Sequence, residues 1–239
     1  MEKKTRGGNK LPAIIAAALE VFAEKGYYNA TIAEIARKAK VSEATVYEYV
    51  GSKEDLLFMI PREITATSVE QMETLLPFVK GAENRLRAVI YGYYILYKEN
   101  PEYSALVLLD LKHNRKFIQT EGYQMVRKAA GFILKIIEDG MKSGEFRDDI
   151  DPVLVRSMVL GTIEHIFFRW HLLERKEELP DFVDPLTEML VRGIRKPDES
   201  RAIQVNISLE EGEAQPARRS QPAKKASGSP KKGSRSATR

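Results

Sequence analysis

Residues 31–57, TIAEIARKAKVSEATVYEYVGSKEDLL, contain the start signals of three helices and one tight turn. Thr31 and Glu34 have the spacing of a capping box, in which the threonine side chain accepts a hydrogen bond from a first-turn amide and the glutamate accepts one from the threonine amide. Ser42 can cap a second helix, and Ser52 stands three residues ahead of an acidic residue at the start of a third. The segment therefore predicts two short helices, a turn and the beginning of a longer helix.

The turn between the first two helices makes this segment a candidate helix-turn-helix unit. Lys40 and Val41 separate the first helix from the second, which we expect from Glu43 to Val50 with Gly51 after it. In such a unit the second helix enters the major groove of DNA. Short amphipathic helices also occur in all-α proteins that never bind DNA. Spacing alone therefore leaves open a helical ligand-binding or interaction module that does not read specific DNA.

The outward residues of the second helix suit a DNA groove. Small residues let the backbone approach, and hydroxyl groups reach phosphates or base edges. We expect Ala44, Thr45 and Glu48 nearest the bases. For Glu48 two roles remain open: its carboxylate either accepts a hydrogen bond from a cytosine amino group or lies at the edge of the interface. The predicted DNA-binding residues are Thr31, Ser42, Glu43, Ala44, Thr45, Tyr47, Glu48, Tyr49 and Lys53, with Thr31, Tyr47, Tyr49 and Lys53 mainly on phosphates.

Residues 11–58 also carry a family resemblance. The run FAEKGYYNAT, then IAEIARKAKVS, then TVYEYVGSKEDLL resembles the N-terminal domain of the TetR family of transcriptional repressors. The residues that carry the resemblance are Phe22, Gly26, Thr31, Ile35, Ala36, Val41, Thr45, Tyr47, Tyr49, Lys53 and Glu54. Val50 departs from the family pattern, which usually has phenylalanine at this core position. The resemblance implies a homodimer that binds a palindromic operator in double-stranded DNA and represses transcription.

Composition narrows the function classes. The chain of 239 residues is 43% hydrophobic and has no cysteine, which excludes disulfides and zinc-thiolate sites and fits a reducing cytoplasm. No apolar run approaches the roughly 18 residues that span a bilayer, so we expect a cytoplasmic protein without a membrane partner. The three histidines do not form HExxH, and GxSxG and GxxxxGK[ST] are absent. We therefore predict no enzyme activity, no metal site and no cofactor.

Charge is divided unevenly along the chain. The net charge is +4, yet residues 201–239 hold nine Lys or Arg against three acids. Such a segment, rich in Gly, Pro, Ala and Ser, cannot bury enough apolar surface to fold. It either adds nonspecific attraction to phosphates or only keeps the chain soluble. The predicted organisation is a basic disordered arm (1–10), a helix-turn-helix DNA-binding domain (11–57), a ligand-binding and dimerisation domain (58–197) and a basic disordered tail (198–239).

The remaining chain is helical in pattern, which predicts an all-α fold of about nine helices. Pro61 should kink the long helix that starts at Lys53, or start its second part. Asp151 before Pro152 is a helix start, and Gly144 a helix end. The helices expected after residue 57 are the remainder of 53–76, then 82–99, 102–112, 117–142, 152–173 and 180–194.

The last two predicted helices are apolar on more than one face, so each must bury a second side. One interpretation is a pair of central core helices. The other is a homodimer interface, which we favour because a helix-turn-helix usually reads paired half-sites by two-fold symmetry. The predicted interface residues are Met158, Gly161, Thr162, His165, Ile166, Leu186 and Leu190.

Aromatic and basic residues in the middle helices suggest a ligand site. Aromatic residues at helical spacing are often plain core, but LVLLDLKHNRKF with GTIEHIFFRW and MLVRGI is similar to the acyl-CoA-responsive, fatty-acid-degradation branch of the same family. That similarity implies a small apolar effector such as a long-chain acyl-CoA. The basic run is otherwise a solvated helix end. The predicted ligand-binding residues are Tyr91, Tyr94, Leu108, Lys112, Arg115, Phe132 and Arg169, with the cations facing the CoA phosphates.

Overall fold

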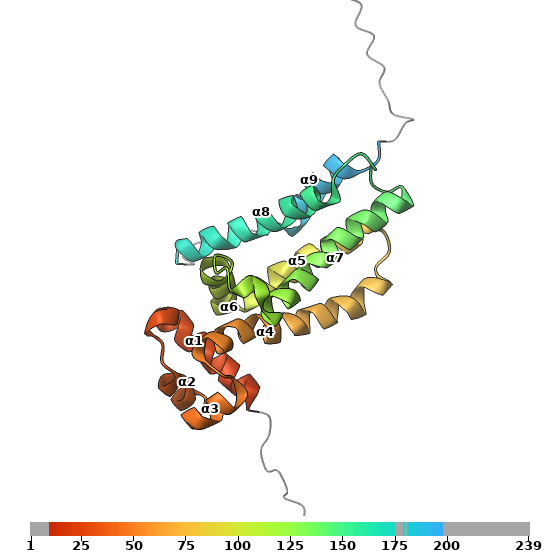
Figure 1. The fold of residues 1–239 in the computed structure, drawn as a ribbon. Helices are drawn as coiled ribbons and strands as arrows, with labels where there is room; N and C mark the ends of the chain where they lie inside the picture. The colour runs from red at the N-terminus through yellow and green to blue at the C-terminus, as the bar shows by residue number, and fades with distance from the viewer. Residues whose placement is uncertain (1–9, 175–178, 180, 198–239) are drawn as a thin grey trace, which may run out of the picture. The chain divides into compact units, whose positions relative to one another are not determined.

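The computed structural model describes residues 10–174, 179 and 181–197. In these residues the chain forms nine α-helices and no β-strand, as the sequence predicts (Figure 1). An isolated bridge joins Phe146 to Arg195. The predicted basic tail, and the predicted arm apart from Lys10, lie outside the described residues.

The first three helices are α1 (Leu11–Asn29), α2 (Ile32–Lys38) and α3 (Glu43–Tyr49). The predicted capping box is present, because the amide of Glu34 donates to Thr31 Oγ1 at 3.2 Å and the amide of Thr31 donates to Glu34 Oε2 at 3.1 Å. Ser42 Oγ accepts from the amide of Thr45 at 3.0 Å and caps α3. Local hydrogen bonds therefore set the start of both short helices, as their spacing predicts.

Helix α4 (Lys53–Leu75) is a single element that continues through Pro61. Ser52 caps it by accepting from the amide of Asp55 at 3.0 Å. A 3₁₀ turn, Leu76–Phe78, follows directly. The kink or restart predicted at Pro61 does not divide the helix, and the proline ring is buried.

The second half of the fold contains α5 (Ala82–Glu99), α6 (Pro101–Ala105), α7 (Glu121–Ser143), α8 (Pro152–Leu172) and α9 (Val183–Ile194). Helix α7 packs against α4, α5 and α8, and α5 also packs against α9. Figure 1 shows α4 leading away from α1–α3 and along α5 and α7. The long helix α7 therefore forms the centre of the helical body.

Three predicted boundaries were wrong. The helix expected over 102–112 is α6 followed by a π-helical segment, Leu106–Leu111. The helix expected from residue 117 starts at Glu121, because Thr120 accepts from the amide of Tyr123 at 3.2 Å and a 3₁₀ turn precedes it. The last helix begins at Val183 rather than near residue 180. The predicted helix end at Gly144, which has φ 78°, and the predicted helix start at Asp151 are confirmed.

Candidate DNA interface and ligand cavity

Helix α3 is anchored by one face and open on the other. Val46 and Val50 are buried in the core, whereas Tyr47 is 51% exposed. Among the other predicted DNA-binding residues, Thr45 and Lys53 are half-buried. The exposed members are Thr31, Ser42, Glu43, Ala44, Glu48 and Tyr49. The α3 face predicted to read DNA is therefore accessible along its whole length.

Tyr49 has a structural contact that the sequence did not predict. Its hydroxyl accepts a hydrogen bond from the amide of Lys10 at 3.3 Å. Lys10 immediately precedes α1, so this bond holds the beginning of α1 beside the end of α3. Tyr49 thus contributes to the shape of the domain as well as to its exposed surface.

Lys53, which was predicted to contact phosphate, is engaged within the protein. Its ammonium donates to the carbonyl oxygens of Tyr27 at 2.8 Å, Tyr28 at 3.3 Å and Ala30 at 2.8 Å. It also lies 4.6 Å from the centre of the Tyr27 ring. Gly26, with φ 72°, interrupts the regular part of α1, so nearby carbonyls lack their usual intrahelical donors. Lys53 supplies those donors and joins α4 to the end of α1.

Two other lysines are also engaged within this domain. Lys38 pairs with Glu20 at 2.7 Å and with Glu24 at 2.8 Å, which ties α2 to α1. Lys25 pairs with Glu34, and its hydrogen bond, with those of Thr31, lowers the pKa of the Glu34 carboxyl to about 2. These pairs hold the α1–α2 corner together and give both lysines carboxylate partners within the chain.

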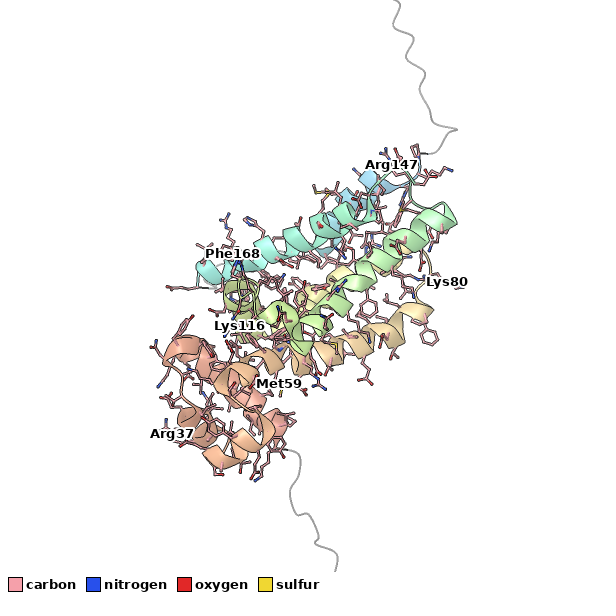
Figure 2. The ribbon with its side chains drawn as sticks, viewed as in Figure 1. Arg37, Met59, Lys80, Lys116, Arg147 and Phe168 are labelled. Carbon is pink, nitrogen blue, oxygen red and sulfur yellow. The ribbon has the colours of Figure 1, made fainter. Side chains whose placement is uncertain are left out.

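Arg37 and Lys40 are exposed basic residues of the helix-turn-helix unit that were not predicted as DNA-binding residues. Neither forms an ion pair within the described part of the chain. Lys40 lies in the turn with φ 57°, and Figure 2 shows Arg37 on the outside of the domain. Exposed cations without a carboxylate partner suit the phosphate backbone better than Lys53 does. Their position in α2 and in the turn is the sequence feature that could have identified them as candidate DNA-binding residues.

Contacts between the segment before α7 and α4 connect the DNA-binding domain with the helical body. Lys116 pairs with Glu54 at 3.0 Å, and Arg62 pairs with Glu121 at 2.6 Å. A Cβ atom at Gly122 would lie 2.2 Å from the carbonyl oxygen of Phe58, so α7 approaches the α4 backbone closely at this point. The first turns of α4 are therefore held against the start of α7 and the segment before it.

A cavity of about 1460 Å³ lies among α1, α4, α5 and α7. Its wall is mainly apolar, which is usual for a small-molecule site. The apolar lining residues include Ile15, Leu19, Ile64, Met72, Leu75, Phe78, Val89, Tyr91, Tyr93, Ile95, Leu96 and Phe132. Ile15 and Leu19 belong to α1, so the DNA-binding domain forms part of the cavity wall.

Only part of the predicted ligand set lines this cavity. Tyr91 and Phe132 do, whereas Tyr94, Leu108, Lys112, Arg115 and Arg169 do not. Tyr94 instead packs edge-on against Phe182 of the α9 end, with ring centres 5.4 Å apart.

The other four members of that set lie elsewhere in the fold. Leu108 is buried in the core, and Lys112 pairs with Glu164 of α8. Arg115 and Arg169 are exposed. The predicted cations therefore do not border this cavity, because the helical pattern does not reveal which neighbours enclose a space.

The exposed apolar surface of α8 contains most of the predicted dimer interface. Met158 is 54% exposed; Gly161, Thr162 and His165 are also exposed, and Ile166 is half-buried. Leu154 and Leu172, not predicted, extend the same face at helical spacing. We name this surface, Leu154, Met158, Gly161, Thr162, His165 and Leu172, the α8 stripe.

The two α9 residues in the predicted interface do not lie on the exposed surface of the chain. Leu186 and Leu190 are buried within the chain, where α9 packs against α5, whereas Met189 is 74% exposed. The physical reason is register: residues four apart share a helix face, and the face containing Leu186 and Leu190 fills this chain's own core.

No group of histidine and acidic residues that could hold a metal ion occurs among the described residues. None of the helices in that part of the chain has the length and apolar character needed to cross a bilayer.

Both halves of the chain match models of known protein families. Residues 14–60 match the model of the bacterial regulatory proteins, tetR family, and residues 62–193 match that of the YsiA-like protein, C-terminal region. The fatty acid metabolism regulator protein of Bacillus subtilis is 29% identical over 185 residues, covering 77% of this chain and 95% of that protein.

Solved structures are similar over the same span. The transcriptional regulator FadR from Bacillus subtilis in complex with stearoyl-CoA has a TM-score of 0.71 at 29% identity, covering 77% of this chain and 99% of that one. The fatty acid degradation regulator FadR from Bacillus halodurans has a TM-score of 0.70 at 24% identity, covering 78% of this chain and 97% of that one, and supports the fold alone.

Proposed function

Because this chain belongs to the TetR family and is thus a DNA-binding transcriptional regulator, we propose that it is a homodimeric repressor released from its operator by a long-chain acyl-CoA. The observation that carries the proposal is the position of α1, which lies both in the DNA-binding domain and in the wall of the apolar cavity. Ligand binding and DNA binding thereby share one helix.

On DNA, α3 of each subunit enters the major groove of one half-site. Val46 and Val50 fix the helix from behind, and Ala44, Thr45 and Glu48 lie nearest the bases. Tyr47, Thr31, Arg37 and Lys40 contact phosphates. Lys53 acts indirectly, since it holds the α1–α2 corner in place.

The α8 stripe supports the homodimer. Leu154, Met158 and Leu172 are large apolar side chains exposed on one helix face, beside Gly161, where a second helix can approach closely. Met189 on α9 is exposed as well. Two copies joined through this face would present two α3 helices to a palindromic site.

The effector acts only through its different affinities for two arrangements of the dimer. Acyl-chain binding in the cavity pushes on Ile15 and Leu19 of α1, and the pairs of Lys38 with Glu20 and Glu24 transmit a displacement of α1 to α2. The distance between the two α3 helices then no longer fits the half-site spacing.

The direct test is selection of bound sequences from random double-stranded DNA, followed by binding measurements with and without stearoyl-CoA. Tyr47→Ala should weaken binding to the selected DNA. Tyr91→Ala is the matched control, because Tyr91 is 55% exposed and Tyr47 51%; without ligand it should bind the DNA as the parent does. Saturating stearoyl-CoA should release the DNA. Failure to select any sequence favours the alternative of a helical ligand-binding or interaction module, and failure of stearoyl-CoA to release DNA rejects the effector.

A further inference from the structure

The charge of the large cavity restricts how an acyl-CoA can lie in it, and the inference below rests on the proposed effector. The charged members of the lining are Glu63 and Glu70, and the described residues of the wall include no Lys, Arg or His. Two carboxylates repel phosphates, and an apolar wall does not solvate them. The cavity therefore fits an acyl chain but not the phosphate groups of the same molecule.

A smaller recess of about 360 Å³ lies next to the cavity and contains cations. It is lined by Glu73, Leu76, Pro77, Arg85, Phe132, Lys135, Ile136 and Asp139. Phe132 lines both spaces. Arg85 lies one helical turn before Val89 on α5, and Lys135 about one turn after Phe132 on α7, so both helices lead from the cavity into the recess.

The extent of the cavity along α5 also suits an acyl chain whose CoA head lies at the recess. The lining residues of α5 run from Ala88 to Leu96, which corresponds to about 12 Å along the helix axis, and Asn100, directly after the helix, extends the lining further. Arg85 is beyond the Ala88 end of that run. An extended apolar chain lying along α5 thus has its first cations at one end, next to Phe132.

Arg85 and Lys135 can each bind a phosphate group, for different reasons. Arg85 Nε donates to the carbonyl of Val79 at 2.8 Å, which orients the guanidinium and leaves its two terminal nitrogens for another acceptor. Lys135 is exposed and makes no ion pair within the described residues.

The carboxylates of the recess are unequally engaged. Glu73 pairs with Lys128 at 2.7 Å, so Asp139 is the remaining acid in the lining of the recess.

The geometry points to a split binding site, in which the apolar cavity holds the acyl chain and Arg85 with Lys135 holds phosphate groups of the CoA head. The chain passes Phe132 between the two spaces. Arg85 provides two parallel N–H donors, the arrangement that binds phosphate well, and Lys135 adds a second charge. Lys112, Arg115 and Arg169 have no part in this site.

The test compares two double variants of the full chain that each remove two positive charges. Arg85→Ala with Lys135→Ala removes the proposed phosphate site, and Arg115→Ala with Arg169→Ala removes two exposed cations that border neither space. Binding of stearoyl-CoA and of stearate, which has no phosphate, is measured by calorimetry at two salt concentrations. Circular dichroism establishes that each variant is folded.

The Arg85/Lys135 variant should bind stearoyl-CoA about tenfold more weakly or worse, bind stearate within about twofold of the parent, and lose salt dependence. The Arg115/Arg169 variant should behave as the parent. Equal stearoyl-CoA affinity in the parent and the Arg85/Lys135 variant overturns the split site but leaves the effector intact. A parent that binds stearate and rejects stearoyl-CoA also overturns it. A parent that binds neither ligand rejects the proposed effector itself.

Discussion

Replacing Lys53 by methionine separates a structural lysine from a phosphate-binding one. Methionine keeps most of the aliphatic stem but removes the ammonium that donates to the carbonyls of Tyr27, Tyr28 and Ala30. Hydrogen bonds from a charged donor are worth about 1.5–3 kcal/mol each when buried. These bonds are partly exposed and the one to Tyr28 is long, so we expect a total loss of about 2–3 kcal/mol.

That loss should be visible in both unfolding and DNA binding. At roughly 2–4 °C per kcal/mol for a chain of this size, the thermal midpoint of Lys53→Met should fall by about 4–12 °C. Lys80→Met, at an exposed loop position labelled in Figure 2, is the matched control and should stay close to the parent. The thermal midpoints of both variants and of the parent are measured by circular dichroism as a function of temperature.

The salt dependence of DNA binding gives the refuting result. A lysine on phosphate contributes about 0.9 to the slope of log K against log salt, or about two per dimer. If Lys53 only positions the α1–α2 corner, the slope of Lys53→Met stays that of the parent although affinity falls. A variant with parental stability and a slope reduced by about two would show that Lys53 contacts phosphate, and the structural role would be wrong.

Three further perturbations follow from particular contacts. Gly122→Ala should destabilise the protein by about 1–3 kcal/mol in urea unfolding, because its Cβ would meet the Phe58 carbonyl oxygen at 2.2 Å. Gly131→Ala is the control in the same helix: its Cβ would have nothing within 4 Å, and it should stabilise the protein by about 0.5–1 kcal/mol. Tyr103→Phe should cost about 1–3 kcal/mol by the same assay, because it leaves the buried Thr65 hydroxyl without its 2.6 Å partner; a value near zero would contradict that bond's importance. The pKa of Glu34 is lowered from 4.5 to about 2 in the fold, mainly by Lys25, so its contribution is complete above about pH 4.5 and is lost as pH falls toward 2; an acid titration of Glu34→Gln should lack that component.

The parts of the fold that the sequence predicted correctly depend on short-range contacts. The caps at Thr31, Ser42 and Ser52 each bond an amide three residues away, so three letters at fixed spacing contain both partners. The helix end at Gly144 and the helix start at Asp151 also depend on short-range bonds, to the carbonyl of Met141 and to the amide of Val153 respectively. The π-helical segment 106–111 was missed because its apolar residues also satisfy the helical pattern, and only tertiary packing distinguishes the two.

The site contacts that the sequence did not predict all involve partners far away in the sequence. Lys53 is charged and near the reading helix in the chain, yet its acceptors lie 23 to 26 residues earlier, at a helix end that Gly26 creates. Arg85 and Lys135 belong to different helices, and no pattern within either helix indicates that one recess contains both. The sequence gives the number and position of the cations along the chain. Their function depends on which carbonyls, carboxylates and cavities lie next to them in the folded structure. Of the four cations with a predicted role on phosphate, Lys53 and Lys112 already have protein partners, so DNA and ligand contacts are better sought among cations without such partners that also border the interface or the cavity.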